Sequence, residues 1–337
     1  MALTAPAWYA VGGIPLDQCE TFLRDLKLVI SAIHVERIMR MQVGITLPQS
    51  EITGDPIAVR DFVQAVEGLG FDHLVMADHV LGADHAQHPA LAGAPYGHEN
   101  AFHEPFVMLG YLAACTTTLE LVPSVLILSQ RQTALVAKQA AQVDLVSGGR
   151  FRLGVGIGWN PVEFEALNEN FHDRGRRSEE QIAVLRALWT QPVVDFVGRW
   201  HRVRHAGLNP LPVQRPIPIW MGGGRGAAPG NRAETVIQRV ARLADGWMPQ
   251  FPPGAEGLAT WERLQTYARD AGRDPSTIGL EGRIRVVGTT PEVWRRELHW
   301  WQEAGASHVN VDTRRGGFSS LDAHLTQLRH LQEAMAS

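Results

Sequence analysis

Apolar and polar positions alternate in blocks along most of the chain, and the blocks predict strands and helices in turn. Met41 to Leu47 is predicted to be a buried strand, Pro56 to Leu69 has apolar residues at helical spacing, and Leu74 to Ala77 is apolar throughout. Short apolar runs without polar alternation are typical of parallel strands covered on both faces. The alternation continues with strands expected at 119–128, 151–157, 217–221, 246–248, 278–287 and 308–312, and helices at 133–146 and 178–189.

Eight strands, each followed by a helix, predict an α/β fold of the (β/α)8 class, a TIM barrel. A doubly wound sheet usually has fewer repeats and a dinucleotide fingerprint. The Gly154-x-Gly156-x-Gly158 run fails that fingerprint, because Trp159 stands where its last glycine is needed. Long insertions rich in Pro, Gly and His follow strands two and four, at 81–103 and 191–216. Such connections commonly build or cover an active site.

Residues 1–40 have a different pattern from the alternating part. Four apolar residues lie at helical spacing between Leu16 and Met39, which predicts an amphipathic helix. The segment is either an additional helix or the result of a start assigned too early, with Met41 as the true first residue. We therefore expect an N-terminal extension at 1–40 and one barrel domain at 41–337.

Composition narrows the expected partners to small molecules. The chain has 337 residues, of which 45% are hydrophobic and 20% charged, so it can bury a barrel-sized core. A net charge of −4 and the absence of a basic run argue against nucleic acid or an anionic membrane surface as a partner. Cys19 and Cys115 are far apart, which excludes a disulfide framework and fits a reducing cytoplasm. Neither a membrane span nor a signal peptide is predicted.

Asp78 and His79 follow the second predicted strand directly, where barrel enzymes place catalytic groups. A histidine there can carry a proton or polarise a carbonyl near neutral pH, and a neighbouring carboxylate can fix its tautomer. The alternative is that Asp78 caps the loop and His79 is an ordinary polar residue. The position at a strand end favours a catalytic His79 supported by Asp78.

Four further histidines in the loop after the second strand do not predict a metal site. Barrel metallohydrolases take ligands from several strand ends and typically have a His-x-His pair on the first strand, yet 41–48 contains no histidine. A His-Glu-x-x-His pair is also missing from the sequence. We therefore expect no metal. The four histidines are His85, His88, His98 and His103.

Glycines gather where two later strands end. Glycines at a strand exit leave room for a flat ligand. The backbone amides of a triple glycine, together with the start of a helix near Asn231, are suited to hold a phosphate. Pro123 interrupts the third strand and predicts a bulge with disturbed pairing. The glycines are Gly154, Gly156 and Gly158 on the fourth strand and Gly222, Gly223 and Gly224 after the fifth.

These features together resemble the luciferase-like monooxygenase superfamily, and in detail its branch that uses the deazaflavin coenzyme F420. The resemblance extends from Met41 to about Asp312, and its most specific part is the run from Asp144 to Gly156. The other motifs match in order and spacing. They are Gly70-Phe71-Asp72, Gly158-Trp159, Glu163-Phe164, Arg174-Gly175-Arg176-Arg177, 212–216, 219–223 and 244–247.

The resemblance implies a luciferase-like barrel with the cofactor ring across its C-terminal mouth and the cofactor phosphate near Gly222 and Gly223. It implies a non-prolyl cis peptide at Ser124–Val125 that presses on the ring, although many relatives have Gly-Thr where this chain has Val122-Pro123. His79 would orient the substrate or exchange a proton beside the ring. The cofactor-binding residues implied are Ser124, Val125, Gly156, Gly158, Trp159, Asn160, Gly222, Gly223 and Gly224, while Glu163 would stabilise the following helix.

The implied reaction is hydride transfer between C5 of coenzyme F420 and a small organic substrate, with the protein supplying position and electrostatics. Relatives that use glucose 6-phosphate have a glutamate near the exit of the fourth strand. This chain has Trp159-Asn160 there instead, so that activity is not carried over. If the cofactor is reduced FMN instead, the same barrel would be a two-component monooxygenase that uses oxygen and a separate reductase. A metal-dependent hydrolase and a non-catalytic flavin-binding barrel are alternatives of other classes. A homodimer is expected.

Overall fold

The structure is a computed structural model that describes residues 40–51, 55–224, 232–318 and 320–336. The chain divides into two compact units, 1–41 and 42–337. The helix expected between Leu16 and Met39 lies outside the described residues, so the two alternatives for the extension stay predictions. The second unit, 42–337, contains the strands and helices that follow.

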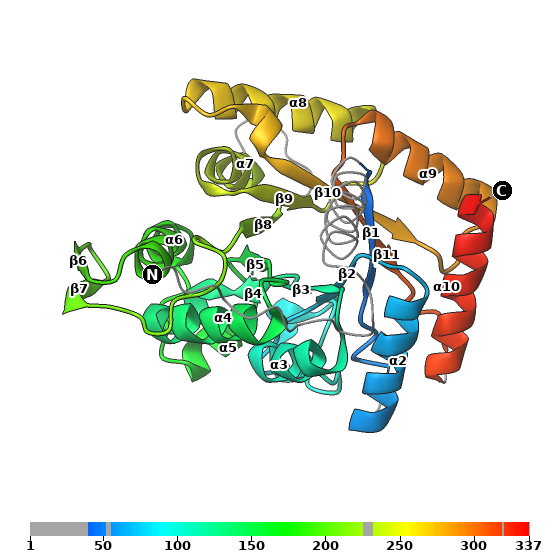
Figure 1. Cartoon of the computed structure of the whole chain (residues 1–337), viewed down its shortest axis with the longest axis horizontal. Helices are drawn as coiled ribbons and strands as arrows, with labels where there is room; N and C mark the ends of the chain where they lie inside the picture. The colour runs from blue at the N-terminus through cyan, green and yellow to red at the C-terminus, as the bar shows by residue number, and fades with distance from the viewer. Residues whose placement is uncertain (1–39, 52–54, 225–231, 319, 337) are drawn as a thin grey trace, which may run out of the picture. The chain divides into compact units, whose positions relative to one another are not determined.

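A ring of parallel strands forms the centre of this unit (Figure 1). Its strands are β1 (Gln42–Thr46), β2 (His73–Met76), β3 (Glu120–Pro123), β4 (Leu126–Ile127), β5 (Leu153–Gly156), β8 (Ile219–Gly223), β9 (Gly246–Pro249), β10 (Gly279–Arg285) and β11 (His308–Asp312). Hydrogen-bonded neighbours follow the order β3-β2-β1-β11-β10-β9-β8-β5-β4.

β3 and β4 are two pieces of one barrel strand, separated by a bulge. β4 pairs with β5, and Leu121 of β3 forms a bridge to Phe151 just before β5. The Leu121 amide donates to the Arg150 carbonyl at 2.8 Å. These bonds close the ring, so the described residues form eight barrel strands and confirm the predicted (β/α)8 class.

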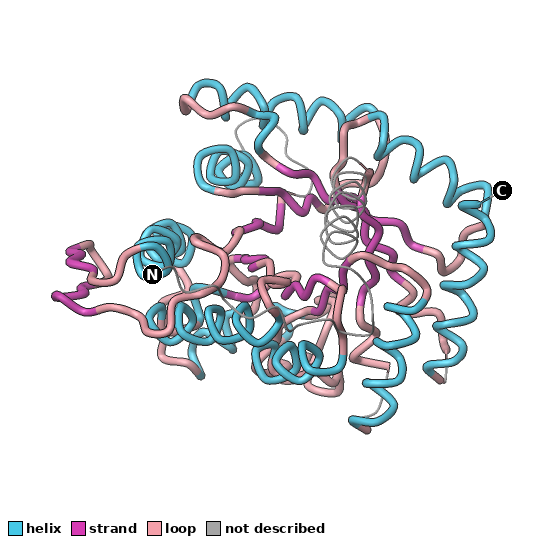
Figure 2. Tube along the Cα trace, in the orientation of Figure 1, coloured by secondary structure: helices cyan, strands magenta, loops and turns pink. Residues whose placement is uncertain are grey.

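Helices surround the strands (Figure 2). The second unit contains α2 (Pro56–Gly68), α3 (Pro105–Cys115), α4 (Thr133–Ser147), α5 (Pro161–Ala166), α6 (Arg174–Thr190), α7 (Arg232–Leu243), α8 (Ala255–Asp270), α9 (Pro291–Glu303) and α10 (Leu321–Ala336). The helices expected at 56–69, 133–146 and 178–189 correspond to α2, α4 and α6.

The ends of α2 and α4 follow from local sequence. Asp55 caps α2 by accepting a hydrogen bond from the Ile57 amide at 2.9 Å, and Pro56 occupies the first helical position, where its missing N–H costs nothing. α4 ends at Gly148, which has φ 69°. A left-handed residue at this place stops a helix and satisfies its last carbonyls, and glycine adopts it without strain.

The two long insertions differ in what they join. Residues 81–103 connect β2 to α3 and contain only the short 3-10 turn η1 (Pro89–Leu91). Residues 191–216 follow α6 rather than a strand and carry an antiparallel hairpin that the sequence pattern did not predict, β6 (Val194–Val197) and β7 (Arg202–Ala206). β7 is mostly exposed, so it lacks the apolar alternation by which a strand is recognised.

The hairpin is fixed to α4 and α6 by its turn. The carboxylate of Glu180 accepts from the amides of Arg199, Trp200 and His201 at 2.7–2.9 Å. The His201 Nε2 atom lies 2.7 Å from the Thr133 hydroxyl at the start of α4. The second insertion therefore packs on the helix layer.

Charged side chains fill the N-terminal part of the barrel interior. Arg152 is buried and pairs with Glu281 at 2.7 Å and with Glu120 at 2.9 Å, and its guanidinium lies 4.2 Å from the centre of the Trp220 ring. Burial by itself would raise the pKa of Glu281, but Arg152 and His73 lower it far below its usual range. A second layer of the interior is apolar and consists of Val75, Val122, Trp220 and Met248, with Val125 packed against it.

Candidate active site

His79 lies just after β2 and is held by a carboxylate that follows β5, two barrel strands away. Its Nδ1 atom is 3.3 Å from both carboxylate oxygens of Glu163, which belongs to α5. A carboxylate can only accept, so this contact places a proton on Nδ1 and leaves Nε2 as an acceptor. Among the described residues, none forms a hydrogen bond with Nε2. His79 can therefore take a proton from a bound molecule at Nε2.

Glu163 is buried, with 1% of its side chain exposed. It also accepts from the amides of Val80 at 2.8 Å and Leu81 at 3.2 Å. Burial alone would raise the pKa of Glu163, but the hydrogen bond and the charge interaction with His79, together with the two amide hydrogen bonds, lower this pKa. Glu163 thus stays ionised and orders the loop that carries His79. Glu163 also lies in the first turn of α5, where a negative charge stabilises a helix, as expected from the sequence.

Asp78 does not support His79, contrary to the sequence-based expectation. Its carboxylate accepts from the Ile127 amide at 2.9 Å and from the Arg131 guanidinium at 2.8 Å. Asp78 is 2% exposed and ties the end of β2 to the segment after the bulge. The side chains of consecutive residues in an extended chain point to opposite sides, so Asp78 faces away from the ring of its neighbour.

Three aromatic rings surround His79. Its ring centre is 4.7 Å from Phe102, 5.4 Å from Tyr96 and 5.6 Å from Trp159. Tyr96 and Phe102 come from the first insertion, and 10% of the His79 side chain remains exposed. The insertion therefore encloses the imidazole in an apolar setting, which strengthens any charge interaction there. Sequence reasoning missed Tyr96 and Phe102, because an aromatic residue in a loop carries no periodic signal.

The bulge in the third strand has the backbone that the family resemblance implies. The peptide bond between Ser124 and Val125 is cis. The Ser124 amide donates to the Met76 carbonyl at 2.6 Å, and both bulge residues are half-buried. Pro123 ends β3 immediately before the bulge, as predicted from the sequence.

Several glycines at the mouth make room for protein side chains. A Cβ at Gly156 would lie 2.4 Å from a methyl of Val125, and a Cβ at Gly222 would lie 2.6 Å from its other methyl. A Cβ at Gly224 would lie 2.9 Å from the Trp247 ring. The bulge thus pushes Val125 between β5 and β8, and glycines on both strands admit it. Space for a flat ligand, expected from these glycines, is taken at Gly156 and Gly222 by Val125.

The remaining predicted cofactor residues lie at the ends of neighbouring strands. Gly158, Trp159 and Gly223 are half-buried, at the C-terminal ends of β5 and β8. Asn160 is 1% exposed; its side chain caps α5 at the Val162 amide and donates to the Leu81 carbonyl at 3.4 Å, so it joins two loops. The helix start near Asn231, expected to help hold a phosphate, lies outside the described residues.

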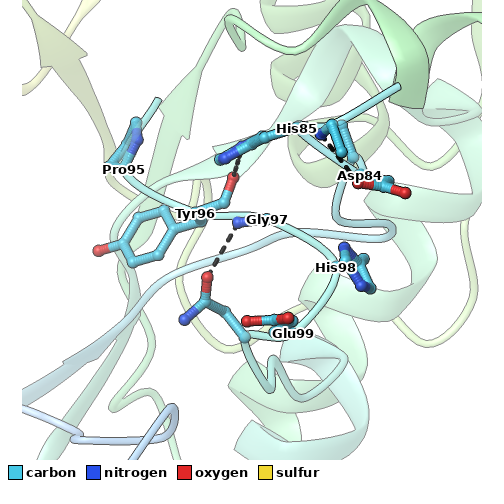
Figure 3. Close-up of a pocket in the computed structure, with 10 residues that line it drawn as sticks. Asp84, His85, Pro95, Tyr96, Gly97, His98 and Glu99 are labelled. Carbon is cyan, nitrogen blue, oxygen red and sulfur yellow. Dashed lines mark hydrogen bonds between the residues drawn. The ribbon is translucent and has the colours of Figure 1, made fainter. Parts of the chain in front are cut away.

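The first insertion contains a small cavity of its own (Figure 3). His85 lines it and its Nε2 atom lies 3.1 Å from the Tyr96 carbonyl, while His98 and Glu99 line the other side. Within the described ranges, no group of three or more His, Cys, Asp or Glu side chains is arranged to hold a metal ion. The described helices likewise include none that is long and apolar enough to cross a membrane.

The residues of the mouth fit a flat, flavin-type ring. Small, half-buried residues lie at the ends of three adjacent strands: Ser124 and Val125, Gly158, and Gly223. His79 stands beside these residues, on the neighbouring strand. Cofactors of this kind lie at the C-terminal face of barrels, where ligand sites concentrate.

Parts of known proteins are similar in sequence to this chain. An uncharacterised protein of Mycobacterium tuberculosis is 39% identical over 147 residues, which are 44% of this chain and 48% of that protein. The FMNH(2)-dependent dimethylsulfone monooxygenase of Pseudomonas putida is 40% identical over 139 residues, 40% of this chain and 38% of that enzyme. The aligned part thus spans about half or less of these curated relatives.

A solved structure has a similar fold. The coenzyme F420 dependent tetrahydromethanopterin reductase from Methanopyrus kandleri superposes with a TM-score of 0.65 at 15% identity, over 87% of this chain and 99% of that one. The family model described as luciferase-like monooxygenase matches residues 40–334. The chain therefore belongs to the luciferase-like monooxygenase family and is an enzyme.

Proposed function

We propose that this enzyme transfers a hydride between C5 of coenzyme F420 and a small organic substrate at the C-terminal mouth of the barrel. The observation that carries the proposal is the His79–Glu163 pair. When a hydride moves to or from a carbon that bears oxygen or nitrogen, that atom must gain or lose a proton. His79, with Nε2 free to accept, is placed to exchange it.

The chain's own residues supply position and proton transfer. Ser124, Val125 and Gly222 would support one face of the ring, and the backbone near Gly223 would bind the phosphate. Glu163 would stabilise the protonated form of His79 after transfer, and the rings of Tyr96 and Phe102 would exclude water from it. Bound coenzyme F420 would supply the hydride chemistry at its C5 atom.

A two-component monooxygenase that uses reduced FMN is the second candidate. It is favoured by the FMNH(2)-dependent dimethylsulfone monooxygenase among the relatives, at 40% identity over the aligned part. The same residues would serve either ring, because they would contact the flat tricyclic part that the two cofactors share. A homodimer, a separate reductase that supplies reduced cofactor, and a cytoplasmic location stay predictions.

A fluorescence titration of the purified full chain with oxidised coenzyme F420 and, in parallel, with FMN decides between the candidates. Micromolar binding of F420, with FMN at least tenfold weaker, is the expected result and directs substrate tests to alcohols, imines and enones. Selective binding of FMN would replace the proposal by the oxygen-using reaction. Binding of neither cofactor would contradict both.

A further inference from the structure

The barrel wall opposite the bulge carries one arginine, Arg283, that faces the barrel axis. In the closed ring, β10 is four places from the strand formed by β3 and β4, so the two lie across the barrel from each other. On β10, Glu281 points inward to Arg152, whereas a Cβ at Gly282 would meet the Trp301 ring of the outer helix α9. Alternation along the strand therefore turns Arg283 inward.

Arg283 is half-buried. In the part of the chain that the structure describes, it forms neither a hydrogen bond nor an ion pair, although a guanidinium carries five N–H donors. Two other arginines of the interior are paired with carboxylates: Arg152 with Glu281 and Glu120, and Arg314 with both oxygens of Asp312 at 2.8–2.9 Å. Leaving such donors without a partner inside the barrel costs free energy unless water or a ligand engages them.

The neighbours of Arg283 add donors and little negative charge. Arg283 is in register with Asn310 on β11, whose Oδ1 atom accepts from the Thr46 hydroxyl at 2.7 Å. That bond occupies the amide oxygen and leaves the amide nitrogen as the group that can donate. Two residues after Asn310 on the same strand, Asp312 forms an ion pair with Arg314, which neutralises its charge. Burial lowers the pKa of Arg283, and the attraction of Asp312 offsets this only in part.

We propose that Arg283 binds the anionic group, a carboxylate or sulfonate, of an organic substrate whose apolar part lies toward Val125 across the barrel. A planar guanidinium matches two oxygens of such a group with two parallel hydrogen bonds. The inference rests on the proposed function, because it assumes that the substrate occupies the same mouth as the cofactor ring. The substrate that reacts with the cofactor ring would then be an organic anion.

The proposal is tested on the full chain without cofactor, by isothermal titration with hexanoate, benzoate and methanesulfonate. Hexanamide and benzamide serve as neutral counterparts of the same shape. We expect at least one anion to bind tenfold or more tightly than its neutral counterpart, and the preference to weaken at high salt. Arg283→Gln should lower anion affinity tenfold or more and leave the neutral compounds unchanged.

Two further variants keep the result interpretable. Arg329→Gln removes an exposed arginine of α10 and should bind anions like the unaltered chain. If Arg283→Gln fails to fold, Arg283→Lys keeps the charge but loses the paired donors, and its anion affinity should fall several-fold. Equal affinity for anions and amides, or unchanged anion affinity in the Arg283 variants, would overturn the proposal.

The cofactor phosphate is another possible occupant of this site, and FMN and riboflavin distinguish it. If Arg283→Gln weakens FMN tenfold but leaves riboflavin unchanged, Arg283 holds the phosphate and the substrate assignment is wrong. If the chain prefers anions but binds neither F420 nor FMN, the anion site is supported and the proposed function is wrong.

Discussion

At the scale of single residues, the site depends on one imidazole whose two nitrogens have different surroundings. His79 Nδ1 lies against Glu163, while no hydrogen bond of the described residues engages Nε2. We expect His79→Ala to reduce turnover about 10²-fold, as loss of a general acid or base does, and to leave cofactor affinity within several-fold. Steady-state kinetics and a cofactor titration measure the two effects. His88→Ala, an exposed histidine of the same loop, is the control, and equal turnover in both variants would exclude His79 from the mechanism.

Glu163 gives the site a pH dependence with a defined sign. Its pKa in the folded chain is lower than in the unfolded chain, where it is about 4.3. The ionised form therefore stabilises the fold above that value, and the stabilisation is lost as the pH falls toward the folded pKa. Glu163→Gln should be less stable than the unaltered chain by about 1–2 kcal/mol at pH 7. Urea unfolding from pH 7 to pH 3.5 should show the difference shrinking, and a constant or growing difference would contradict this origin.

At the scale of elements, the end of α4 tests the conformational role of one glycine. A Cβ at Gly148 would meet nothing within 4 Å, so the cost of Gly148→Ala comes from its φ of 69° alone. We expect a loss of about 1 kcal/mol in the free energy of unfolding. Gly68, at the end of α2, also has open space but no positive φ, so Gly68→Ala should be neutral or stabilise by about 0.5–1 kcal/mol. Chemical denaturation measures both, and equal effects would contradict the argument.

At the scale of the whole molecule, the charged cluster inside the barrel connects strands far apart in sequence. Arg152, directly before the fourth barrel strand, is held by Glu281 on the seventh and Glu120 on the third. Glu281 is 3% exposed and Glu120 is 27% exposed. Glu281→Gln should cost about 3 kcal/mol, because it leaves a buried guanidinium with one partner, and Glu120→Gln about 1 kcal/mol. Thermal and urea unfolding compare them, and the reverse order would mean that Glu120 is the principal partner.

Much of the barrel was predictable from the chain alone. The apolar segments predicted a strand at 308–312, which has the same bounds as β11, and a helix that begins at Thr133, as α4 does. Both predictions rest on the regular spacing of buried apolar residues along the sequence. Pro123 marked the bulge, since a proline cannot donate within a strand. The hairpin at 194–206 was missed, because its exposed strands are stabilised by contacts of Glu180 in α6 rather than by their own pattern.

The sequence by itself determined the barrel class, the family and the placement of His79 at a strand end, because these follow from local periodicity and from motifs read in order. Only the tertiary structure decided which groups meet. It paired His79 with Glu163, 84 residues away, instead of the adjacent Asp78. It also assigned Gly156 and Gly222 to the methyls of Val125 and left Arg283 unpaired among the described residues. Side chains from distant strands converge at the mouth through barrel closure, and spacing along one chain carries no information on that convergence.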